Sequence, residues 1–354
     1  MTNKKFTCID LLAGIGGFHI AMHEAGGKCV FASEIDKFAR QTYEHNFKKI
    51  SPKVFTNGNF NEDITKQDYS KIPDFDVLCA GFPCQPFSNA GLRKGFDDTR
   101  GTLFFNIKEI IRKKIEDNKA PKIILLENVK GFKNHDKGKT YKTVEKTLNH
   151  LGYVVTSEVL NTKNFGIPQN RERIFIVAWN HDLIKADKFD FPVGIDEKGN
   201  YLYNKKDLEK TRKTEVQQIL LSNCEIKDLE KKANRKYTIS EKLWAGHQRR
   251  KKEHRKKGNG FGYSLFDNNS SYTSTISARY YKDGSEILID QTKTNRRPRK
   301  LHPIEAARLQ GFPIDTWYSF PVSDTQAYKQ LGNSVTVPVV SALAKEIKEQ
   351  LLKG

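Results

Sequence analysis

The segment Asp76-Val-Leu-Cys-Ala-Gly-Phe-Pro-Cys-Gln-Pro-Phe-Ser88 determines how the rest of the chain is interpreted. Its residues 77–80 form a short apolar run typical of a buried strand, and Gly81 and Pro83 then end regular structure. Cys84 is therefore expected in a loop just past the C-terminal end of a strand, where open α/β sheets place their ligands. This segment by itself leaves two interpretations of Cys84 open, a nucleophile and a small buried hydrophobic residue.

The composition indicates a folded, intracellular protein with two domains. The chain has 354 residues, of which 37% are hydrophobic and 29% are charged. No apolar run approaches the roughly 20 residues of a membrane span, and residues 1–10 lead directly into a strand-like run, so we expect neither a membrane segment nor a signal peptide. The five cysteines form no C-x-x-C pair, which indicates neither a disulfide framework nor a metal site, and favours a reducing compartment such as the cytoplasm. They are residues 8, 29, 79, 84 and 224.

The formal net charge of +19 favours a polyanionic partner. The alternative is a basic surface with no role in nucleic-acid binding. Residues 247–257 hold seven Lys or Arg and one Glu, and they are followed by the glycine-rich segment 258–264 and by 275–284, which adds Arg279 and two tyrosines. A charge run is usually a solvated helix face. Flexible backbone and aromatic residues beside it instead favour contacts to phosphates and bases.

The N-terminal region has the pattern of a strand, a glycine turn, a helix and a second strand over residues 7–32. The turn is Gly14-Ile-Gly-Gly-Phe18, and Glu34 follows 20 residues after Gly14. An acidic residue at that distance in a βαβ unit is placed to hold the hydroxyls of a ribose. His19 stands where the dinucleotide fingerprint needs its last glycine, so a nucleoside cofactor without phosphates, such as S-adenosylmethionine, fits better. The alternative is tight helix–strand packing with Glu34 at the surface.

Further polar residues are expected at the same edge of the sheet. Glu127 follows an apolar strand, and a carboxylate at that position faces the ligand edge. Arg171 and Arg173 are two residues apart, so extended backbone would point them in the same direction. That arrangement indicates recognition of an anion or a carbonyl, with a solvated strand start as the alternative. Asp63 could accept a hydrogen bond from an adenine amino group, although by itself it is better interpreted as a helix cap.

Strands and helices alternate up to about residue 180, which predicts an open, doubly wound, mostly parallel sheet with helices on both faces. The basic, glycine-rich segment 89–101 beside Cys84 has the composition of a lid. Pro303 and Gly311 delimit a predicted helix. The sequence predicts helices over 18–25, 102–115, 139–151, 299–312 and 339–352. It predicts strands over 7–13, 29–32, 77–80, 122–126, 153–160 and 174–179.

Six sequence blocks stand out along the chain. They are Asp10-Leu-Leu-Ala-Gly-Ile-Gly-Gly-Phe18, Gly81-Phe-Pro-Cys-Gln-Pro-Phe-Ser88, Glu127-Asn-Val129, Gln169-Asn-Arg-Glu-Arg173, Arg308-Leu-Gln-Gly-Phe-Pro313 and Gln330-Leu-Gly-Asn-Ser-Val335. In this order they resemble the blocks of bacterial DNA cytosine-5 methyltransferases, and the resemblance covers nearly the whole chain outside residues 185–245. Residues 257–263 and 277–284 further resemble the Dcm-type enzymes, which methylate CC-containing sites such as CCWGG.

The resemblance implies the S-adenosylmethionine-dependent methyltransferase fold. It implies a catalytic and cofactor-binding domain over residues 1–184, an irregular, β-containing recognition domain over 185–324, and a C-terminal segment, 325–354, that returns to the catalytic domain. It further implies a monomer that binds double-stranded DNA, flips the target cytosine and methylates its C5 at a CC-containing site such as CCWGG, CCNGG or CCGG. The biological setting it implies is protection of DNA from a restriction endonuclease.

The resemblance also implies roles for single residues. Cys84 would add to C6 of the cytosine, Glu127 would bind N3 and the amino group, Arg173 would bind the O2 carbonyl, and Arg171 would support the Cys84 loop or bind a phosphate. The residues implied to bind the cofactor are Asp10, Ala13, Gly14, Gly16, Gly17, Phe18, Glu34, Ile35, Asp63, Ile64, Gly81, Pro83, Leu103, Asn333, Ser334 and Val335. Those implied to contact DNA are Gln85, Ser88, Arg100, Arg250, Lys257, Asn259, Arg279, Tyr280 and Tyr281.

Three other functions are compatible with parts of the sequence. A tRNA cytosine-5 methyltransferase shares the core blocks, but the long basic region with the Dcm-type pieces argues against it. A DNA-binding module without activity is disfavoured because Cys84, Glu127, Arg171 and Arg173 are all present. A nicotinamide-dependent dehydrogenase is disfavoured by the missing glycine at position 19.

Overall fold

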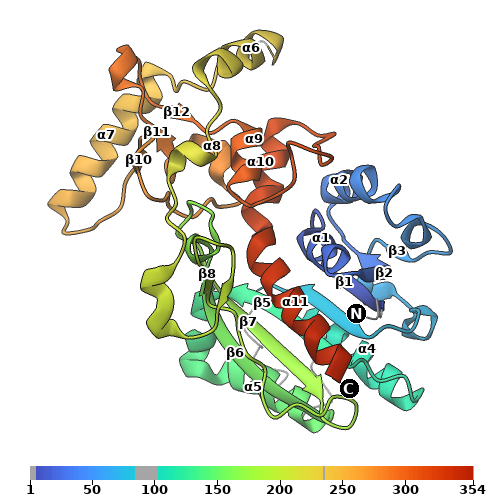
Figure 1. Cartoon of the computed structure of the whole chain (residues 1–354). Helices are drawn as coiled ribbons and strands as arrows, with labels where there is room; N and C mark the ends of the chain where they lie inside the picture. Colours follow the sequence, from blue (N-terminus) through green and yellow to red (C-terminus); the bar gives the residue numbers. More distant parts are fainter. Residues whose placement is uncertain (1–4, 84–102, 234–235, 354) are drawn as a thin grey trace.

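The computed structural model describes residues 5–83, 103–233 and 236–353. Seven of the described strands form one sheet in the order β3-β2-β1-β4-β5-β7-β6 (Figure 1). All neighbours in it are parallel except β7, which is antiparallel to β5 and β6. The predicted mostly parallel, doubly wound sheet is therefore confirmed. The strands are β1 (Phe6–Leu11), β2 (Gly27–Ser33), β3 (Phe60–Asn61), β4 (Val77–Gly81), β5 (Ile123–Val129), β6 (Tyr153–Asn161) and β7 (Glu172–Asn180).

Helices cover both faces of this sheet because the central strands are apolar on both sides. Cys79 and Leu125 belong to a hydrophobic core shared with α1, α2 and α11, whereas Leu78 and Leu126 belong to a second core shared with α4 and α5. Successive residues of a strand point to opposite faces, which separates the two cores. These helices are α1 (Gly17–Glu24), α2 (Lys37–Phe47), α4 (Leu103–Glu116), α5 (Lys139–His150) and α11 (Val337–Lys353).

The strand order reverses between β1 and β4, and their carboxyl ends form the crevice where ligands bind in such sheets. β1 ends at Leu11, two residues before the predicted end, because Leu12 has a φ of 57° and Gly14 a φ of 55°. Gly16 then begins the turn into α1 with a φ of 86°. A Cβ at this position would lie 2.2 Å from the ring of Phe47, so only glycine fits here.

Residues 194–333 contain short strands and separate helices beside the large sheet (Figure 1). The helix predicted over 299–312 is shorter than expected, since Arg299–Lys300 is a strand, His302 caps α9 and Gly311 has a φ of 70°. None of the described helices combines the length and the apolar composition needed to cross a membrane. The elements are β8 (Gly194–Ile195), β9 (Tyr201–Leu202), α6 (Asn223–Ala233), α7 (Glu241–Lys256), β10 (Leu265–Phe266), α8 (Tyr280–Asp283), β11 (Leu288–Ile289), β12 (Arg299–Lys300), α9 (Pro303–Arg308) and α10 (Asp324–Asn333).

The last two helices pack in different places. α10 packs against α8 and α9, whereas α11 packs against α1, which lies on the large sheet. The bounds proposed for the domains, 1–184, 185–324 and 325–354, stay a prediction.

Candidate active site

The glycine turn after β1 is held by the carboxylate of Glu34. The amide of Gly14 donates to Oε2 of Glu34 over 2.7 Å, and the amide of Asp36 donates to Oε1 over 2.7 Å. Burial raises the pKa of Glu34, and these two amides oppose the rise. Because each carboxylate oxygen accepts one of these bonds and has a further lone pair, Glu34 can still accept hydrogen bonds from a ligand.

Glu127 and Arg173 form an ion pair across neighbouring strands. The Nε of Arg173 lies 3.1 Å from Oε1 of Glu127, and both side chains are mostly buried. Burial raises the pKa of the Glu127 carboxyl, while Arg173 and Arg171 lower it in part. The result is a carboxyl group that holds a proton more readily than an exposed glutamate, beside a guanidinium with donors to spare. That combination suits a partner with an acceptor nitrogen and a carbonyl oxygen.

The chain that leads to Cys84 is anchored beside this pair. Asn128 donates from Nδ2 to the carbonyl of Phe82 over 2.9 Å, and Oδ1 of Asn128 accepts from the amide of Val129. Gly81 leaves room for Glu127, since a Cβ there would lie 3.3 Å from Oε2 of the carboxylate. Asn128 was not assigned a role from the sequence, although it stands next to Glu127 in a quoted block. Cys84, Gln85, Ser88 and Arg100 lie outside the described residues.

Arg171 supports the backbone of two other segments, and its predicted role at the Cys84 loop or at a phosphate stays a prediction. Its guanidinium is buried and donates to the carbonyls of Ile276, Gly332 and Ser334, at 3.1, 3.2 and 2.7 Å. Burial lowers the pKa of Arg171. Within the described residues it therefore links two distant parts of the chain through backbone carbonyls.

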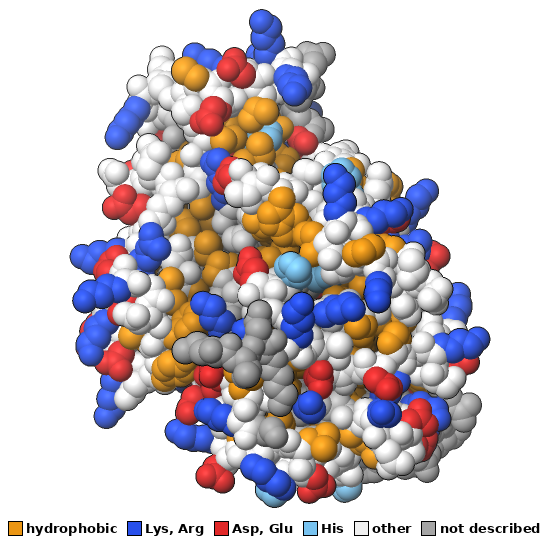
Figure 2. Space-filling model, turned by 45° about the vertical axis from the view of Figure 1, so that its right-hand side comes forward, with side chains coloured by type: hydrophobic (Ala, Val, Ile, Leu, Met, Phe, Trp, Pro, Cys, Tyr) orange, Lys and Arg blue, Asp and Glu red, His pale blue; other side chains and the backbone are white. Residues whose placement is uncertain are grey.

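These groups line one cavity of about 430 Å³ at the carboxyl edge of the sheet. Figure 2 shows hydrophobic side chains gathered in the hollow between the smaller and the larger part of the molecule, with Lys and Arg side chains around it. The predicted site residues that line the cavity are Gly14, Glu34, Ile35, Gly81, Pro83, Leu103, Glu127, Arg171, Arg173, Asn333 and Ser334. Lining residues that were not predicted are Leu12, Ile15, Asp36, Ala39, Phe82, Asn128, Val129, Lys329, Gln330 and Gly332.

Other residues predicted to bind the cofactor do not line this cavity. Asp10 is buried within β1, and burial raises its pKa. Asp63 caps a short 3-10 helix by accepting from the amide and the hydroxyl of Thr65, so the helix-cap interpretation is the one that the structure supports. The remaining residues of this kind are Ala13, Gly16, Gly17, Phe18, Ile64 and Val335.

Some of the predicted DNA contacts are exposed side chains, and others are buried or hydrogen-bonded within the protein. Lys257, Asn259 and Arg279 are exposed, whereas Tyr281 is partly buried. The DNA-contact prediction for Tyr280 is wrong in this structure, because its ring is fully buried and its hydroxyl donates to Ile287 and accepts from the amide of Leu301. Arg250 is also exposed, and its guanidinium pairs with Asp283 over 3.2 Å and reaches Nδ1 of His247, so its DNA contact stays a prediction.

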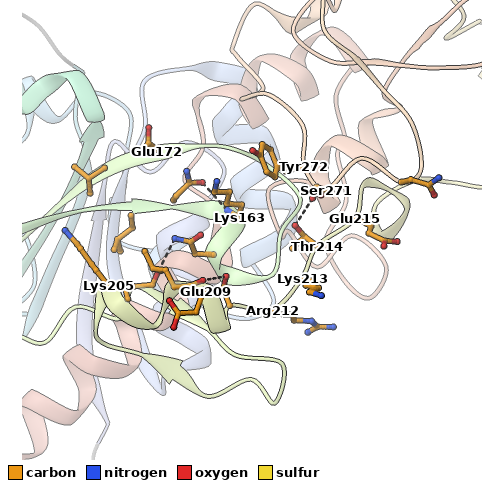
Figure 3. Close-up of a pocket in the computed structure, with 18 residues that line it drawn as sticks. Lys163, Glu172, Lys205, Glu209, Arg212, Lys213, Thr214, Glu215, Ser271 and Tyr272 are labelled. Carbon is orange, nitrogen blue, oxygen red and sulfur yellow. Dashed lines mark hydrogen bonds between the residues drawn. The ribbon is translucent and has the colours of Figure 1, made fainter.

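A second cavity, of about 760 Å³, lies at the outer strand β6 (Figure 3). Its wall mixes basic side chains such as Lys163 and Arg212 with acidic ones such as Glu209 and Glu215. Lys163 stands over the ring of Tyr272, 4.6 Å from the centroid. This cavity has neither the glycine turn nor the carboxyl–guanidinium pair, so the smaller cavity is the candidate active site.

Known proteins resemble this chain in sequence over almost its full length. Residues 6–349 match the family model described as C-5 cytosine-specific DNA methylase. The chain is 50% identical over 352 residues to the Type II methyltransferase M1.ScrFI of Lactococcus lactis subsp. cremoris, a match that covers 99% of this chain and 80% of the relative. It is also 50% identical over 349 residues to the Type II methyltransferase M.NlaX of Neisseria lactamica, covering 98% and 97% of the two chains.

The fold likewise matches solved structures. The crystal structure of the S. pombe Dnmt2 methyltransferase aligns with a TM-score of 0.70 over 99% of both chains, at 21% sequence identity. At this identity the likeness establishes the arrangement of the elements and nothing about the substrate.

Proposed function

This chain belongs to the C-5 cytosine-specific DNA methylase family, and from that premise we propose that it flips a cytosine out of duplex DNA and transfers the methyl group of S-adenosylmethionine to C5 of the base. The observation that carries the proposal is that the Glu127–Arg173 pair and the Gly14–Glu34 turn line the same cavity. The pair suits the N3 and O2 edge of cytosine, and the turn suits a nucleoside, so both reactants could meet there.

The residues that line the cavity fit S-adenosylmethionine. Glu34 keeps lone pairs for the ribose hydroxyls, and the bare backbone at Gly14 allows a close approach. Ile35 is 65% exposed and offers an apolar surface to adenine. The volume of about 430 Å³ lies within the roughly 300–1,000 Å³ of ligand pockets. When bound, the cofactor supplies a methyl group made electrophilic by its sulfonium.

The base must be activated first, because C5 of cytosine is a weak nucleophile. We assign Cys84 as the group whose sulfur bonds to C6, while Glu127 gives its proton to N3 and Arg173 donates to O2 through Nη2. The ring is then an enamine that can take the methyl group at C5. Water takes the C5 proton, and the electrons of that C–H bond form the C5–C6 double bond again. The C6–S bond then breaks to release the Cys84 thiolate, and N3 returns its proton to Glu127. A thiol of pKa about 8.5 is a few per cent ionised at pH 7, so activation of the ring by Glu127 matters more than activation of the thiol.

The relatives also suggest the biological setting. Both are Type II methyltransferases, which supports a place for this chain in a restriction-modification system. We propose that it acts as a monomer at a CC-containing site such as CCWGG, CCNGG or CCGG, and that the methylation protects DNA from a partner endonuclease. The proposed DNA contacts among the described residues are Arg250, Lys257, Asn259, Arg279 and Tyr281. Gln85, Ser88 and Arg100, which lie outside the described residues, remain proposed contacts as well.

Bisulfite sequencing of DNA and tRNA from cells that express the chain tests this function. We expect cytosines in one CC-containing duplex sequence to resist conversion, and to convert normally in cells that express the Cys84→Ser variant. Resistant cytosines in tRNA with none in DNA would replace the proposal with the tRNA methyltransferase. Full conversion of both nucleic acids, with soluble protein present, would overturn it.

A further inference from the structure

Residues 168–171 are hydrogen-bonded to residues 273–276. The first segment belongs to the proposed catalytic domain, 1–184, and the second to the proposed recognition domain, 185–324; these domains are called the catalytic part and the recognition part below. The amide of Asn170 donates to the carbonyl of Thr273 over 2.9 Å, and the amide of Ile276 donates to Oε1 of Gln169 over 3.0 Å. Gln169 is fully buried. Residues 273–279, called the recognition segment below, are therefore attached to the catalytic part by hydrogen bonds at a buried position.

Arg171 extends this connection to the wall of the candidate cofactor cavity. One Nη donates to Ile276 in the recognition segment, and the other donates to Gly332 and Ser334 in residues 330–334, called the cavity wall below. Four of these wall residues, 330 and 332–334, line the cavity directly. Because a guanidinium is a rigid planar fork, one end cannot shift without changing the hydrogen bonds at the other.

Gly332 brings the two segments into direct contact. A Cβ on this glycine would lie 2.2 Å from the backbone nitrogen of Ala278, so the recognition segment occupies the space where a side chain would be. Arg279, the next residue, is exposed and is one of the proposed DNA contacts. A contact made to DNA at Arg279 is thus one residue from backbone that packs on the cavity wall.

The third nitrogen of the Arg171 guanidinium, Nε, differs from the two Nη atoms. It is buried and has no hydrogen-bond partner among the residues that the structure describes, while the Arg171 side chain itself lines the cavity. A buried donor without a partner is unfavourable, so the place of the guanidinium depends on the three carbonyls that its two Nη atoms contact.

We infer that Arg171 is a positioning residue that couples DNA recognition to cofactor affinity. The inference rests on the proposed function, since it takes duplex DNA and S-adenosylmethionine as the two ligands. DNA bound at Arg279 restrains the recognition segment further, and through Ile276 and Arg171 it stabilises the carbonyls of Gly332 and Ser334 in the conformation that binds the cofactor. Linkage requires the reverse effect to be equal, so that the cofactor tightens DNA binding by the same factor.

The test measures the dissociation constant of S-adenosylhomocysteine, which cannot react, with and without a saturating duplex that contains the methylated site. We expect the duplex to lower this constant by about tenfold in the unmodified chain. In the Arg171→Lys variant one ammonium replaces the planar fork, and we expect the ratio of the two constants to fall below about twofold. The Gly332→Ala variant places a methyl group where the recognition segment packs on the cavity wall, and it should lose the coupling too.

The matched control is Tyr280→Phe, which removes a buried hydroxyl from the recognition part without touching the cavity wall. This variant loses two buried hydrogen bonds, but its ratio of the two constants should remain that of the unmodified chain. A ratio of one in the unmodified chain, or a full ratio in Arg171→Lys, would overturn the inference. If S-adenosylhomocysteine or the duplex does not bind to the unmodified chain at all, the proposed function has failed instead.

A measurement on the unmodified chain covers the case in which the variants do not fold. Hydrogen exchange of the amides at 330–334 should slow when the duplex alone is added, and exchange at 273–279 should slow when S-adenosylhomocysteine alone is added. Protection confined to the segment nearer each ligand would contradict the coupling.

Discussion

Arg173 reaches Glu127 diagonally across two antiparallel strands. In the register of β5 and β7, Arg173 is opposite Val129 and Glu127 is opposite Phe175, yet the Nε of Arg173 lies 3.1 Å from Oε1 of Glu127. The guanidinium thus holds one carboxylate oxygen from the side and leaves Oε2 beside Gly81. This orientation fixes the carboxyl group without using all of its hydrogen-bonding capacity.

The first prediction concerns Glu127 as a proton donor. The Glu127→Gln variant keeps the size of the side chain and loses the acidic proton, so the rate of methyl transfer should fall about 10²-fold or more. Transfer of a labelled methyl group to duplex DNA under single-turnover conditions measures the rate. Glu172→Gln is the matched control, because Glu172 is the neighbouring residue to Arg173 and pairs with Lys130 at the surface. A tenfold or smaller effect in Glu127→Gln would leave Glu127 a positioning role only.

The raised pKa of Glu127 sets a second prediction, on pH. The protonated carboxyl is the active form of Glu127, whereas the Cys84 thiolate fraction changes kcat/KM for DNA in the same way with and without Glu127. The ratio of kcat/KM in the unmodified chain to that in the Glu127→Gln variant should therefore be constant at low pH and fall as pH rises through the raised pKa of Glu127. pH profiles from 5.5 to 9 on the two proteins measure this ratio, and a ratio that does not change with pH would assign the titration to another group.

Local features of the sequence were sufficient to predict the strand–turn–helix that positions Glu34. Positive φ at Gly14 and Gly16 is a property of these residues themselves, and the apolar runs of β1 and β4 have the length of buried strands. The edge at which Glu127 and Arg173 meet follows from strand direction, which the alternation of elements already indicates.

The partners of Arg171 could not be predicted in this way. Ile276, Gly332 and Ser334 are 105, 161 and 163 residues away in the chain, and backbone carbonyls carry no signal in the sequence. Tyr280 is the opposite case, since a tyrosine beside Arg279 in a basic region suggested surface contact. Its burial depends on packing against Tyr328, which lies in α10.

A third prediction tests the glycine turn. The Glu34→Ala variant removes both backbone contacts of the carboxylate as well as the proposed acceptor for ribose, and the dissociation constant of S-adenosylhomocysteine should rise about ten- to hundredfold. Isothermal titration measures the constant in the absence of DNA. Glu44→Ala is the control, because Glu44 forms an exposed ion pair with Lys48 on α2 and should leave cofactor binding unchanged. Equal affinity in Glu34→Ala would remove Glu34 from the proposed site.

A fourth prediction concerns the stability of the recognition part. Arg299 donates to both oxygens of Glu305, at 2.7 and 2.8 Å, and Glu305 is fully buried. Replacing Glu305 by alanine leaves a buried cation unpaired, so the free energy of unfolding should fall by about 3–5 kcal/mol. Urea denaturation measures this loss. Asp315→Ala breaks the more exposed pair with Arg308 and should cost about 1 kcal/mol or less. Similar losses in the two variants would contradict the assignment.

The last prediction concerns Cys84, which follows the anchored residues Phe82 and Pro83. Serine at this position is a far weaker nucleophile, so the Cys84→Ser variant should bind S-adenosylhomocysteine and duplex DNA with unchanged dissociation constants but lose nearly all methyl transfer. Duplex DNA with 5-fluorocytosine at the target gives a direct readout, because fluorine cannot leave as the C5 proton does. The unmodified chain with S-adenosylmethionine should become covalently joined to this DNA through residue 84, as seen by denaturing gel and peptide mass, and the serine variant should not. Methyl transfer by Cys84→Ser at the unmodified rate, or no adduct with the unmodified chain at its own site, is incompatible with addition of this sulfur to C6.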